Sequence, residues 1–253
     1  MKVTFLGTGT SQGVPVIACD CRVCHSLDPH DKRLRTSIWL EINDLSVVID
    51  TGPDFRQQML KHHVSRLDAI LFTHEHKDHT AGLDDVRAFN FRQQMDMPVY
   101  AHPRVQGSLR QEFAYIFAEK KYPGIPKIQL HDIGLESFQI QDVDITPIEV
   151  MHYKLPVLGF RFQDFTYITD AKTIAPQEID KIKGSKVVVI NALQKAPHLS
   201  HLTWDEALTL AAEIGAEATY FTHISHKLGL HRELEKELPE GVFLAHDGLT
   251  LTL

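Results

Sequence analysis

The stretch THEHKDH at positions 73–79 decides the fold, because a short apolar run delivers a dense set of ligand-type side chains. His74 and His76 are two residues apart, so in an extended chain both rings point to one side. Asp78 and His79 follow where the chain turns toward a helix-like segment. The zincin H-E-x-x-H pattern does not apply, because position 78 carries Asp rather than His. A solvated polar loop explains this order of residues after a buried strand poorly, so the stretch favours a metal site.

Further ligand candidates follow three strand-like runs in the second half of the chain. His152 comes after DITPIEV, Asp170 ends FTYITD, and His223 ends ATYFTH. A single His or Asp at a strand end is usually a turn residue. Three of them, together with the first cluster, indicate side chains that meet at one edge of a sheet and bind metal.

The chain alternates strand-like and helix-like segments in two halves. Residues 203–206 (TWDE) read as a capping box, and a periodic apolar face follows until Gly215 stops the helix. A second helix is expected from Pro103. The expected strand-rich segments are 2–7, 37–42, 45–50, 69–73, 138–150, 157–170, 186–192, 218–223 and a closing pair of strands within 242–253. Two strand-rich halves with helices between them predict two packed sheets covered by helices, an αββα arrangement in one domain over 1–253.

Composition limits the classes of function. The 253 residues, 43% of them hydrophobic, suffice for a large core, and the net charge of −7 makes a nucleic-acid partner improbable. No apolar run approaches the roughly 18 residues of a membrane span, and the start does not read as a signal peptide. We therefore expect a cytoplasmic protein without a membrane partner.

All three cysteines lie in one short stretch. Cys19, Cys21 and Cys24 form a C-x-C-x-x-C pattern that lets one loop supply three thiolates. In a reducing compartment such a cluster favours metal binding over disulfides. A tetrahedral zinc site needs a fourth ligand, and the cluster itself does not decide which residue supplies it.

The combined pattern resembles the metallo-β-lactamase fold superfamily of metal-dependent hydrolases, with VVIDTG (47–52) as the acidic strand end before the histidine cluster. The resemblance implies an α/β fold, the four-layer αββα sandwich of that superfamily, and a binuclear site. Asp50 would orient ligands without binding metal itself, although a plain strand-end turn residue is an equal alternative. The implied ligands are His74, His76 and His152 for one metal, Asp78, His79 and His223 for the other, and Asp170 between them.

The resemblance also implies the chemistry. A hydroxide that bridges two divalent metals, Zn or Mn, would attack the substrate at neutral pH, and the cations would neutralise charge in the transition state. Asp78 thereby counts as a catalytic residue as well as a ligand.

Further motifs resemble the PhnP-like branch, whose named member is phosphoribosyl 1,2-cyclic phosphate phosphodiesterase. They are FLGTGTSQGVP (5–15) before the cysteines, DAKT after the strand that ends near 169, THISH (222–226) and HDGL (246–249). The branch implies a structural zinc held by the three cysteines and by His226. His25 and His30 are competing fourth ligands, the first strained by its place beside Cys24.

Other site residues follow from the branch and from phosphodiester chemistry. His201 occupies the branch's catalytic position and would protonate the leaving group or stabilise the transition state. His198, Lys154 and Arg87 are candidate substrate contacts, with ordinary surface roles as the alternative. An insertion at 95–126, rich in aromatic residues, either caps the site or covers the sheet.

The resulting hypothesis is a metal-dependent phosphodiesterase, a phosphoric diester hydrolase acting on small or cyclic phosphodiesters such as cyclic ribose phosphates or nucleotides. Alternatives in the same superfamily are a transfer-RNA 3′-end endonuclease and a thioester or lactone hydrolase. A regulatory metal-binding module is the non-enzyme alternative. The branch resemblance also favours a homodimer.

Overall fold

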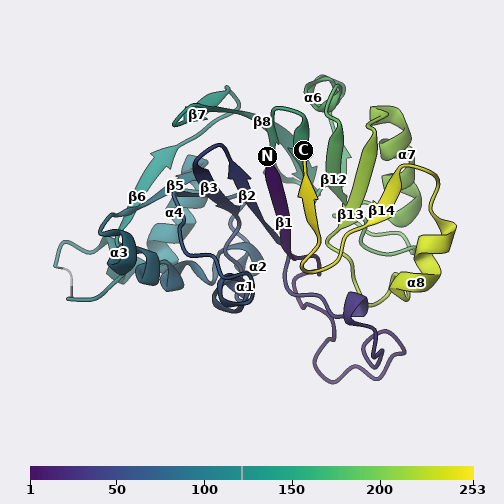
Figure 1. Ribbon diagram of the computed structural model, residues 1–253, viewed down its shortest axis with the longest axis horizontal. Coiled ribbons are helices and arrows are strands. Elements are labelled where there is room, and N and C mark those ends of the chain that lie inside the picture. Colours follow the sequence, from purple (N-terminus) through teal and green to yellow (C-terminus); the bar gives the residue numbers. More distant parts are fainter. Residues whose placement is uncertain (121) are drawn as a thin grey trace.

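The computed structural model describes residues 1–120 and 122–253. Within these residues, strands build two sheets that pack face to face, with helices on the outer face of each (Figure 1). The first sheet has the order β15-β1-β2-β3-β4-β5-β6. The second runs β11-β8-β9-β10-β12-β13-β14, and β7 pairs with β8. The predicted αββα sandwich is confirmed.

The strands and helices have the following bounds. The first sheet contains β1 (Lys2–Gly7), β2 (Ser37–Ile42), β3 (Leu45–Ile49), β4 (Ala69–Leu71), β5 (Met97–Ala101), β6 (Ile128–Asp132) and β15 (Thr250–Thr252). The second contains β7 (Phe138–Ile140), β8 (Val143–His152), β9 (Leu155–Phe162), β10 (Phe165–Tyr167), β11 (Thr173–Ile174), β12 (Val187–Asn191), β13 (Ala218–Thr222) and β14 (Val242–Leu244). The α-helices are α1 (Phe55–Lys61), α2 (Lys77–Thr80), α3 (Arg87–Gln93), α4 (Pro103–Glu112), α5 (Ala114–Phe117), α6 (Pro176–Ile182), α7 (Trp204–Ile214) and α8 (His231–Leu234).

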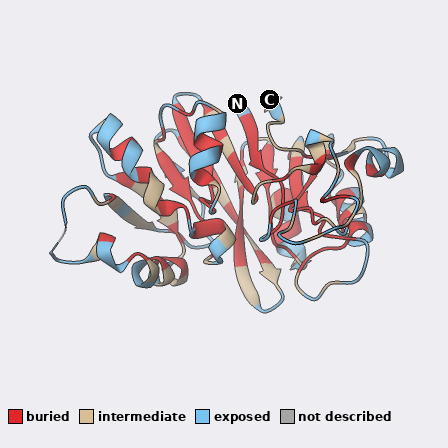
Figure 2. Cartoon of the chain, turned by 90° about the horizontal axis from the view of Figure 1, so that it is seen from below, coloured by how far each residue is buried: buried red, intermediate tan, exposed pale blue. Residues whose placement is uncertain are grey.

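Strand β3 shows why the sequence forms a four-layer structure. Its residues LSVVI are all buried, as expected of a strand covered on both faces. Val47 and Ile49 join the core between the two sheets, whereas Val48 joins the core under α1, α3 and α4. A third core lies between the second sheet and α6 and α7. Figure 2 shows burial running through both sheets, while the outer helices expose one face.

Parallel pairing sets the position of the site. In the first sheet β3, β4, β5 and β6 pair in parallel, and in the second β10, β12, β13 and β14 do so. Ligand-binding side chains in such sheets gather beyond the carboxyl ends of parallel strands. The backbone N–H of Leu158 donates to the carbonyl of Thr73 at 3.0 Å, so the two sheets are tied together at this edge.

The structure corrects one sequence-based expectation and refines another. The insertion at 95–126 begins with β5, an ordinary strand of the first sheet, and β6 follows it. Methionine, proline and tyrosine interrupt the aliphatic strand pattern there and mask the strand. The helix expected from Pro103 ends at Glu112, and a short separate helix, α5, follows Phe113. Lys121, within this segment, lies outside the described residues.

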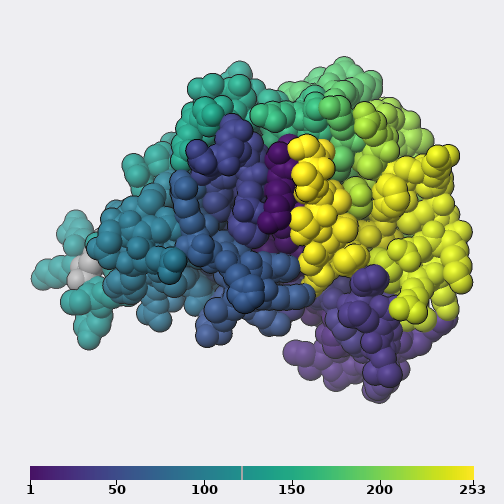
Figure 3. Space-filling view, in the orientation of Figure 1, coloured from purple at the N-terminus to yellow at the C-terminus, as the bar shows by residue number. Residues whose placement is uncertain are grey.

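The loop between β1 and β2 forms a lobe at one end of the sandwich, below the C-terminal strand in Figure 3. Val14 and Arg33 exchange backbone hydrogen bonds of 2.8 Å and so close the loop on itself. Ile224 donates its N–H to the carbonyl of Thr8, also at 2.8 Å. The lobe that carries the cysteines is therefore joined to the segment that follows β13.

Candidate metal centre

The residues predicted as metal ligands lie at the edge where the parallel strands end. The loop 74–79 follows β4, His152 ends β8, Asp170 follows β10, and His223 follows β13. Ligand atoms of six of these residues, together with those of His201, form three groups, and the atoms within each group lie within 4.8 Å of one another. The groups are His74 with His79 and Asp170, Asp78 with His79 and His223, and His152 with Asp170 and His201.

His76 belongs to the same assembly although it is the most exposed of the histidines in its loop. Its Nδ1 lies 3.0 Å from Nε2 of His74, and its ring centroid lies 5.2 Å from that of His152. Metal–nitrogen bonds of about 2.1 Å at tetrahedral angles separate ligand atoms by about 3.4 Å. The separation of the His74 and His76 nitrogens is therefore close to that of two ligands on one metal, and the His152 ring lies beside them.

Asp50 fixes the ring orientation of two ligands. Its carboxylate accepts hydrogen bonds from the N–H and hydroxyl of Thr73 at 2.9 and 2.8 Å and from Nδ1 of His79 at 2.7 Å. Because the Thr73 hydroxyl gives its proton to Asp50, it accepts one from Nδ1 of His74 at 2.9 Å. Both histidines thus keep Nε2 free for a metal.

The orientation of His152 is fixed in the same way by carbonyl groups. Its Nδ1 donates to the carbonyl of Ser200 at 2.9 Å and to that of Asp170 at 3.1 Å. Carbonyl oxygens only accept, so Nδ1 carries the proton and Nε2 has the free lone pair.

Buried nitrogen atoms without hydrogen-bond partners test whether these residues fit metals. Among the described residues, Nε2 of His79 and both ring nitrogens of His223 are buried without a partner. Nε2 of His79 lies 3.2 Å from oxygens of Asp78 and Asp170, and Nε2 of His223 lies 3.3 Å from Asp170, without hydrogen-bond geometry. Such atoms are costly in a folded protein unless something binds them. The donor set fits two divalent cations.

The electrostatics of the cluster point the same way. Burial opposes charge on His79, yet the carboxylates of Asp78, Asp170 and Asp50 raise its pKa well above the ordinary value. Burial likewise disfavours the Asp170 carboxylate, but His223 and His79 hold its pKa well below the usual range. The site therefore gathers negative charge that a cation can neutralise.

Three ligand-related residues have left-handed backbone conformations. Asp50, Asp170 and His223 have φ values of +65°, +58° and +54°, an uncommon conformation for residues other than glycine. Asp50 and His223 directly follow β3 and β13, and Asp170 lies in the turn shortly after β10. Local strain of this kind concentrates at functional sites.

Sequence reasoning missed Asn191, which supports the turn at Asp170. Its side-chain oxygen accepts from the N–H of Ala171 at 2.7 Å, and its amide donates to the carbonyl of Ala171 at 3.0 Å. Asn191 is fully buried at the end of β12. A polar residue that ends an otherwise apolar strand, VVVIN, was the available signal.

His201 lies inside the assembly rather than at its rim. Its Nδ1 lies 3.7 Å from an oxygen of Asp170, and its ring centroid lies 4.5 Å from that of His152 and 4.8 Å from that of His223. Burial, reinforced by His223, lowers the pKa of His201 to about 3. The residue is therefore a neutral imidazole at pH 7 in the metal-free protein.

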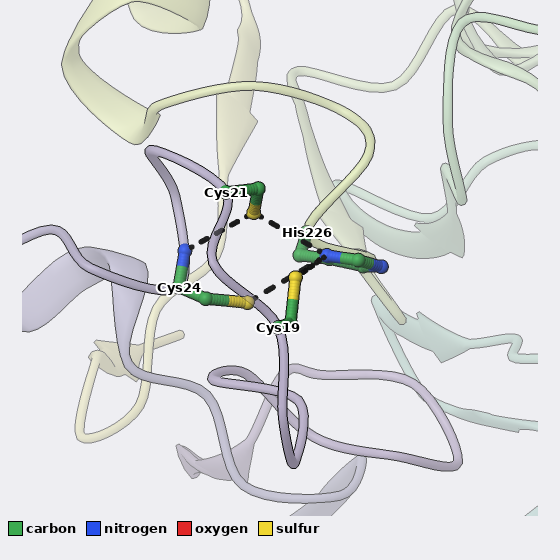
Figure 4. A group of neighbouring side chains, drawn as sticks. All are labelled: Cys19, Cys21, Cys24 and His226. Atoms are coloured by element: carbon green, nitrogen blue, oxygen red, sulfur yellow. Dashed lines mark hydrogen bonds between the residues drawn. The ribbon is translucent and has the colours of Figure 1, made fainter.

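The three cysteines meet His226, as the branch resemblance implied (Figure 4). Nδ1 of His226 lies 3.2 Å from Sγ of Cys19, 3.4 Å from that of Cys21 and 3.6 Å from that of Cys24. Zinc–sulfur and zinc–nitrogen bonds of about 2.3 and 2.0 Å at a tetrahedral angle place these atoms about 3.5 Å apart. The spacing thus fits one zinc ion.

The competing histidines lie elsewhere. His25 faces Asp20, with 3.5 Å between Nε2 and a carboxylate oxygen. His30 stacks on His246 with 4.1 Å between ring centroids and meets His231 edge-on at 4.7 Å. Neither belongs to the group that the cysteines form.

The candidate substrate contacts fall in different places. Lys154 lines a hollow beside His76 and His152, and His198 lines another beside His201. Arg87 lines a hollow next to α3 whose described lining contains none of the predicted metal ligands. Phe113 is buried in the core under α4, whereas Tyr115 is exposed.

The family model described as the beta-lactamase superfamily domain matches residues 46–224, which contain all seven predicted ligands of the binuclear site. The chain belongs to the beta-lactamase superfamily. A crystal structure described as a new diphosphatase from the PhnP family is 39% identical, with a TM-score of 0.93 over 100% of this chain and 97% of that one. The predicted superfamily and its PhnP-like branch are thereby confirmed.

One further relative shares only the fold with this chain, and another is similar in sequence over about half of its own length. Zn²⁺-bound PqqB from Methylobacterium extorquens, 19% identical over 100% of both chains with a TM-score of 0.82, shares the fold. The curated octanoyltransferase of Porphyromonas gingivalis is 40% identical over 253 residues, which are 98% of this chain and 51% of that protein. The chain therefore spans about half the length of that relative.

Among the described residues, no helix is long and apolar enough to cross a membrane.

Proposed function

We propose that the protein is a metal-dependent phosphodiesterase for small or cyclic phosphodiesters. The observation that carries the proposal is the convergence of six predicted ligand side chains in overlapping groups, with His76 beside His74 and His152, and with partnerless buried nitrogens at His79 and His223. The similarity to a PhnP-family diphosphatase supports phosphoryl chemistry. Because both sheets contribute ligands, we further propose that residues 1–253 act as one domain.

The proposed role of each residue follows from the geometry of the site. Two bound divalent cations, Zn or Mn, would supply a water nucleophile active at neutral pH and neutralise charge on the phosphoryl group. Asp50 and the carbonyl of Ser200 hold the ligand imidazoles in the correct tautomers. Asn191 holds the turn that presents Asp170 to both groups of ligands.

We propose that His201 supplies a proton to the leaving oxygen or stabilises the transition state. It lies beside Asp170 and His223, where the reacting phosphoryl group would bind. The ring that is neutral in the metal-free protein donates one N–H as a hydrogen bond, which favours stabilisation of charge on the leaving oxygen, whereas full proton transfer requires the ring to be protonated in the substrate complex. The His201→Ala variant should lose about 10²- to 10⁴-fold in turnover. The loss should be much smaller for a p-nitrophenolate leaving group than for an alkoxide, which needs the proton; an equal loss for both would exclude the acid role. His63→Ala, at an exposed turn, is the control.

We propose that the cysteine cluster, made of Cys19, Cys21, Cys24 and His226, holds a structural zinc. Four protein ligands leave no open position, as in structural rather than catalytic zinc sites. The N–H groups of Val16 and Cys24 point at the thiolate sulfurs of Cys24 and Cys21, at 3.3 and 3.4 Å. The purified protein should then contain nearly three metals per chain.

The activity is tested with four substrate classes in Mn²⁺ or Zn²⁺. We expect cleavage of bis-p-nitrophenyl phosphate and of a 2′,3′-cyclic nucleotide, and no processing of precursor transfer RNA or a lactone. Asp170→Asn should abolish the activity, whereas Asp164→Asn, at an exposed ion pair with Lys186, should not. Absence of phosphodiester cleavage with either metal would refute the proposal.

A second candidate is hydrolysis of an octanoyl thioester, which the name of the Porphyromonas gingivalis relative favours. The transferase activity named there can equally reside in the half of that protein that this chain does not match. An octanoyl thioester in the same assay separates the two candidates, because the phosphodiesterase proposal expects no thiol release.

A further inference from the structure

Two hollows of different character are each bordered by predicted metal ligands. One, of about 510 Å³, is bordered by the ligands His76 and His152, and its lining includes large apolar side chains. The other, of about 210 Å³, is bordered by His223 and His201 and has mostly polar lining residues. A substrate that occupies both would contact predicted metal ligands in each.

One short loop separates the hollows. His198 and His201 face the polar hollow, whereas Leu199 and Ser200, which lie between them in sequence, line the apolar one. The loop is fixed where Ser200 accepts the hydrogen bond from Nδ1 of His152. The wall between the hollows is thus positioned by a predicted metal ligand.

The apolar hollow offers a platform for a flat ring. Tyr153 is 50% exposed with a φ of +58° in the tight turn between β8 and β9, and Leu199 is 67% exposed. Leu155 also lines this hollow, and Nζ of Lys154 lies 5.3 Å from the centroid of the Tyr153 ring. Exposed aromatic and aliphatic side chains beside a polar centre are suited to stacking a nucleobase.

The polar hollow offers hydrogen-bond donors and positive charge. Its lining includes Ser11, Gln12, His198 and Lys227, and its described lining contains no carboxylate. Nδ1 of His198 accepts the N–H of Ser200 at 3.3 Å, so the neutral ring carries its proton on Nε2. With the exposed ammonium of Lys227, this hollow suits an anionic group such as a phosphate.

Resting on the proposed function, whose metal-assisted attack of water on phosphorus also cleaves a phosphoanhydride, we propose that the substrate is an unsymmetrical nucleoside diphosphate ester that spans both hollows. The base stacks on Tyr153 and Leu199, and the distal phosphate binds beside Lys227 and His198. The oxygen of one water molecule bonds to the phosphorus on the nucleoside side, and the bridging oxygen leaves with the distal phosphate. The two protons of that water pass to the products or to solvent, giving a nucleoside monophosphate and a second phosphate monoester.

The test compares ADP-ribose with methyl p-nitrophenyl phosphate, which lacks both a base and a second phosphate. In metal-loaded protein, Tyr153→Ala should raise the KM for ADP-ribose, divided by the KM for methyl p-nitrophenyl phosphate, by about 5- to 100-fold. Tyr153→Phe, which keeps the ring, should restore most of the ratio, and Lys227→Met should raise it through the distal phosphate. Tyr122→Ala, an exposed tyrosine outside both hollows, is the matched control.

Calorimetry with AMP gives a readout that does not depend on turnover. Tyr153→Ala and Leu199→Ser should weaken AMP binding, and Lys227→Met should leave it within twofold because AMP has no distal phosphate. Cleavage of methyl p-nitrophenyl phosphate without cleavage of ADP-ribose would overturn the inference alone, as would an unchanged KM ratio in Tyr153→Ala. Cleavage of neither would overturn the proposed function itself.

Discussion

The Asp50 carboxylate accepts a hydrogen bond from Nδ1 of His79 at 2.7 Å, although the two residues are 29 positions apart, Asp50 directly after β3 and His79 in helix α2. Both side chains are fully buried. Burial raises the pKa of Asp50, and the charge and hydrogen bond of His79 oppose that rise. The pair couples the end of β3 to the ligand loop after β4 and links the orientation of the ligands to the packing of the first sheet.

Asp50→Asn should impair metal binding without removing any proposed ligand. An amide presents an NH₂ group to Thr73 or His79, so one of these donors loses its acceptor and a ligand imidazole loses its fixed tautomer. We expect metal affinity or activity to fall about 10- to 100-fold, measured by titration of metal-free protein with Zn²⁺. Asp164→Asn, a surface carboxylate beside Lys186, should bind metal normally. Unchanged affinity in Asp50→Asn would mean that Asp50 is only a turn residue.

Much of this arrangement could be predicted from sequence because local patterns and ligand chemistry coincide. THEHKDH follows a buried strand, and the capping box at 203–206 begins α7, which ends at Gly215 with a φ of +67°. What the sequence left open depends on contacts between distant segments. Asn191 was missed because its two bonds reach a backbone 20 residues away. The roles of Tyr153 and Leu199 depend on which loops border the same hollow.

The closing pair of strands shows a similar limit. Residues 242–253 contain two strand-like runs that read as one pair, yet β14 joins the second sheet beside β13 and β15 joins the first beside β1. Hydrophobic pattern alone does not distinguish these pairings, because both strands are short and partly exposed. The site residues themselves are unaffected by this difference.

Gly52→Ala should destabilise the protein at the metal loop. A Cβ at this position would lie 2.1 Å from the carbonyl oxygen of Asp78, which is backbone and cannot rotate away. Overpacking of this kind costs about 1–3 kcal/mol, and we expect a lower Tm with weakened metal binding. Gly107→Ala, in helix α4 with open space around the added methyl, should instead raise Tm by a few degrees. Thermal unfolding of both variants tests the contrast, and equal Tm values would contradict it.

Asn191→Ala should separate positioning from stability. The substitution removes both hydrogen bonds to Ala171 and frees the turn that presents Asp170. Asn90→Ala is the matched control, because Asn90 also bonds backbone groups, those of Met95 and Lys127, but far from the ligands. Both variants should lower Tm, and only Asn191→Ala should weaken Zn²⁺ binding in a calorimetric titration. Equal metal affinity in the two variants would assign Asn191 a purely structural role.

The cysteines should differ in reactivity in metal-free protein. The N–H of Cys24 stabilises the Cys21 thiolate and, with His226, lowers the pKa of Cys21 to about 6, whereas burial raises the pKa of Cys24 to about 11. A thiol is deprotonated above its pKa, so the alkylation rate of Cys21 should rise through about pH 6 and level off by neutral pH, while Cys24 stays protonated. Mass spectrometry after iodoacetamide pulses measures this order. Zinc should protect both thiols, and urea should abolish the difference; faster labelling of Cys24 in the folded protein would contradict the prediction.

Cys21→Ser should remove one zinc and also lower turnover, although Cys21 lies outside the binuclear site. His226, a proposed ligand of the structural zinc, is three residues from His223, a proposed ligand of the binuclear site. The backbone N–H of Ile224, which lies between them, donates to the carbonyl of Thr8. The segment 223–226 therefore connects the cysteine loop to the binuclear site. Without the zinc, this connection loses its anchor and the Nε2 of His223 is no longer held toward Asp170. Metal analysis should fall from nearly three to about two per chain, with reduced kcat and weaker Mn²⁺ binding at the remaining site. Arg22→Ala, beside Cys21 and paired with Glu233 at the surface, is the control that should keep the zinc. Full activity after loss of one zinc would show that the two sites are independent.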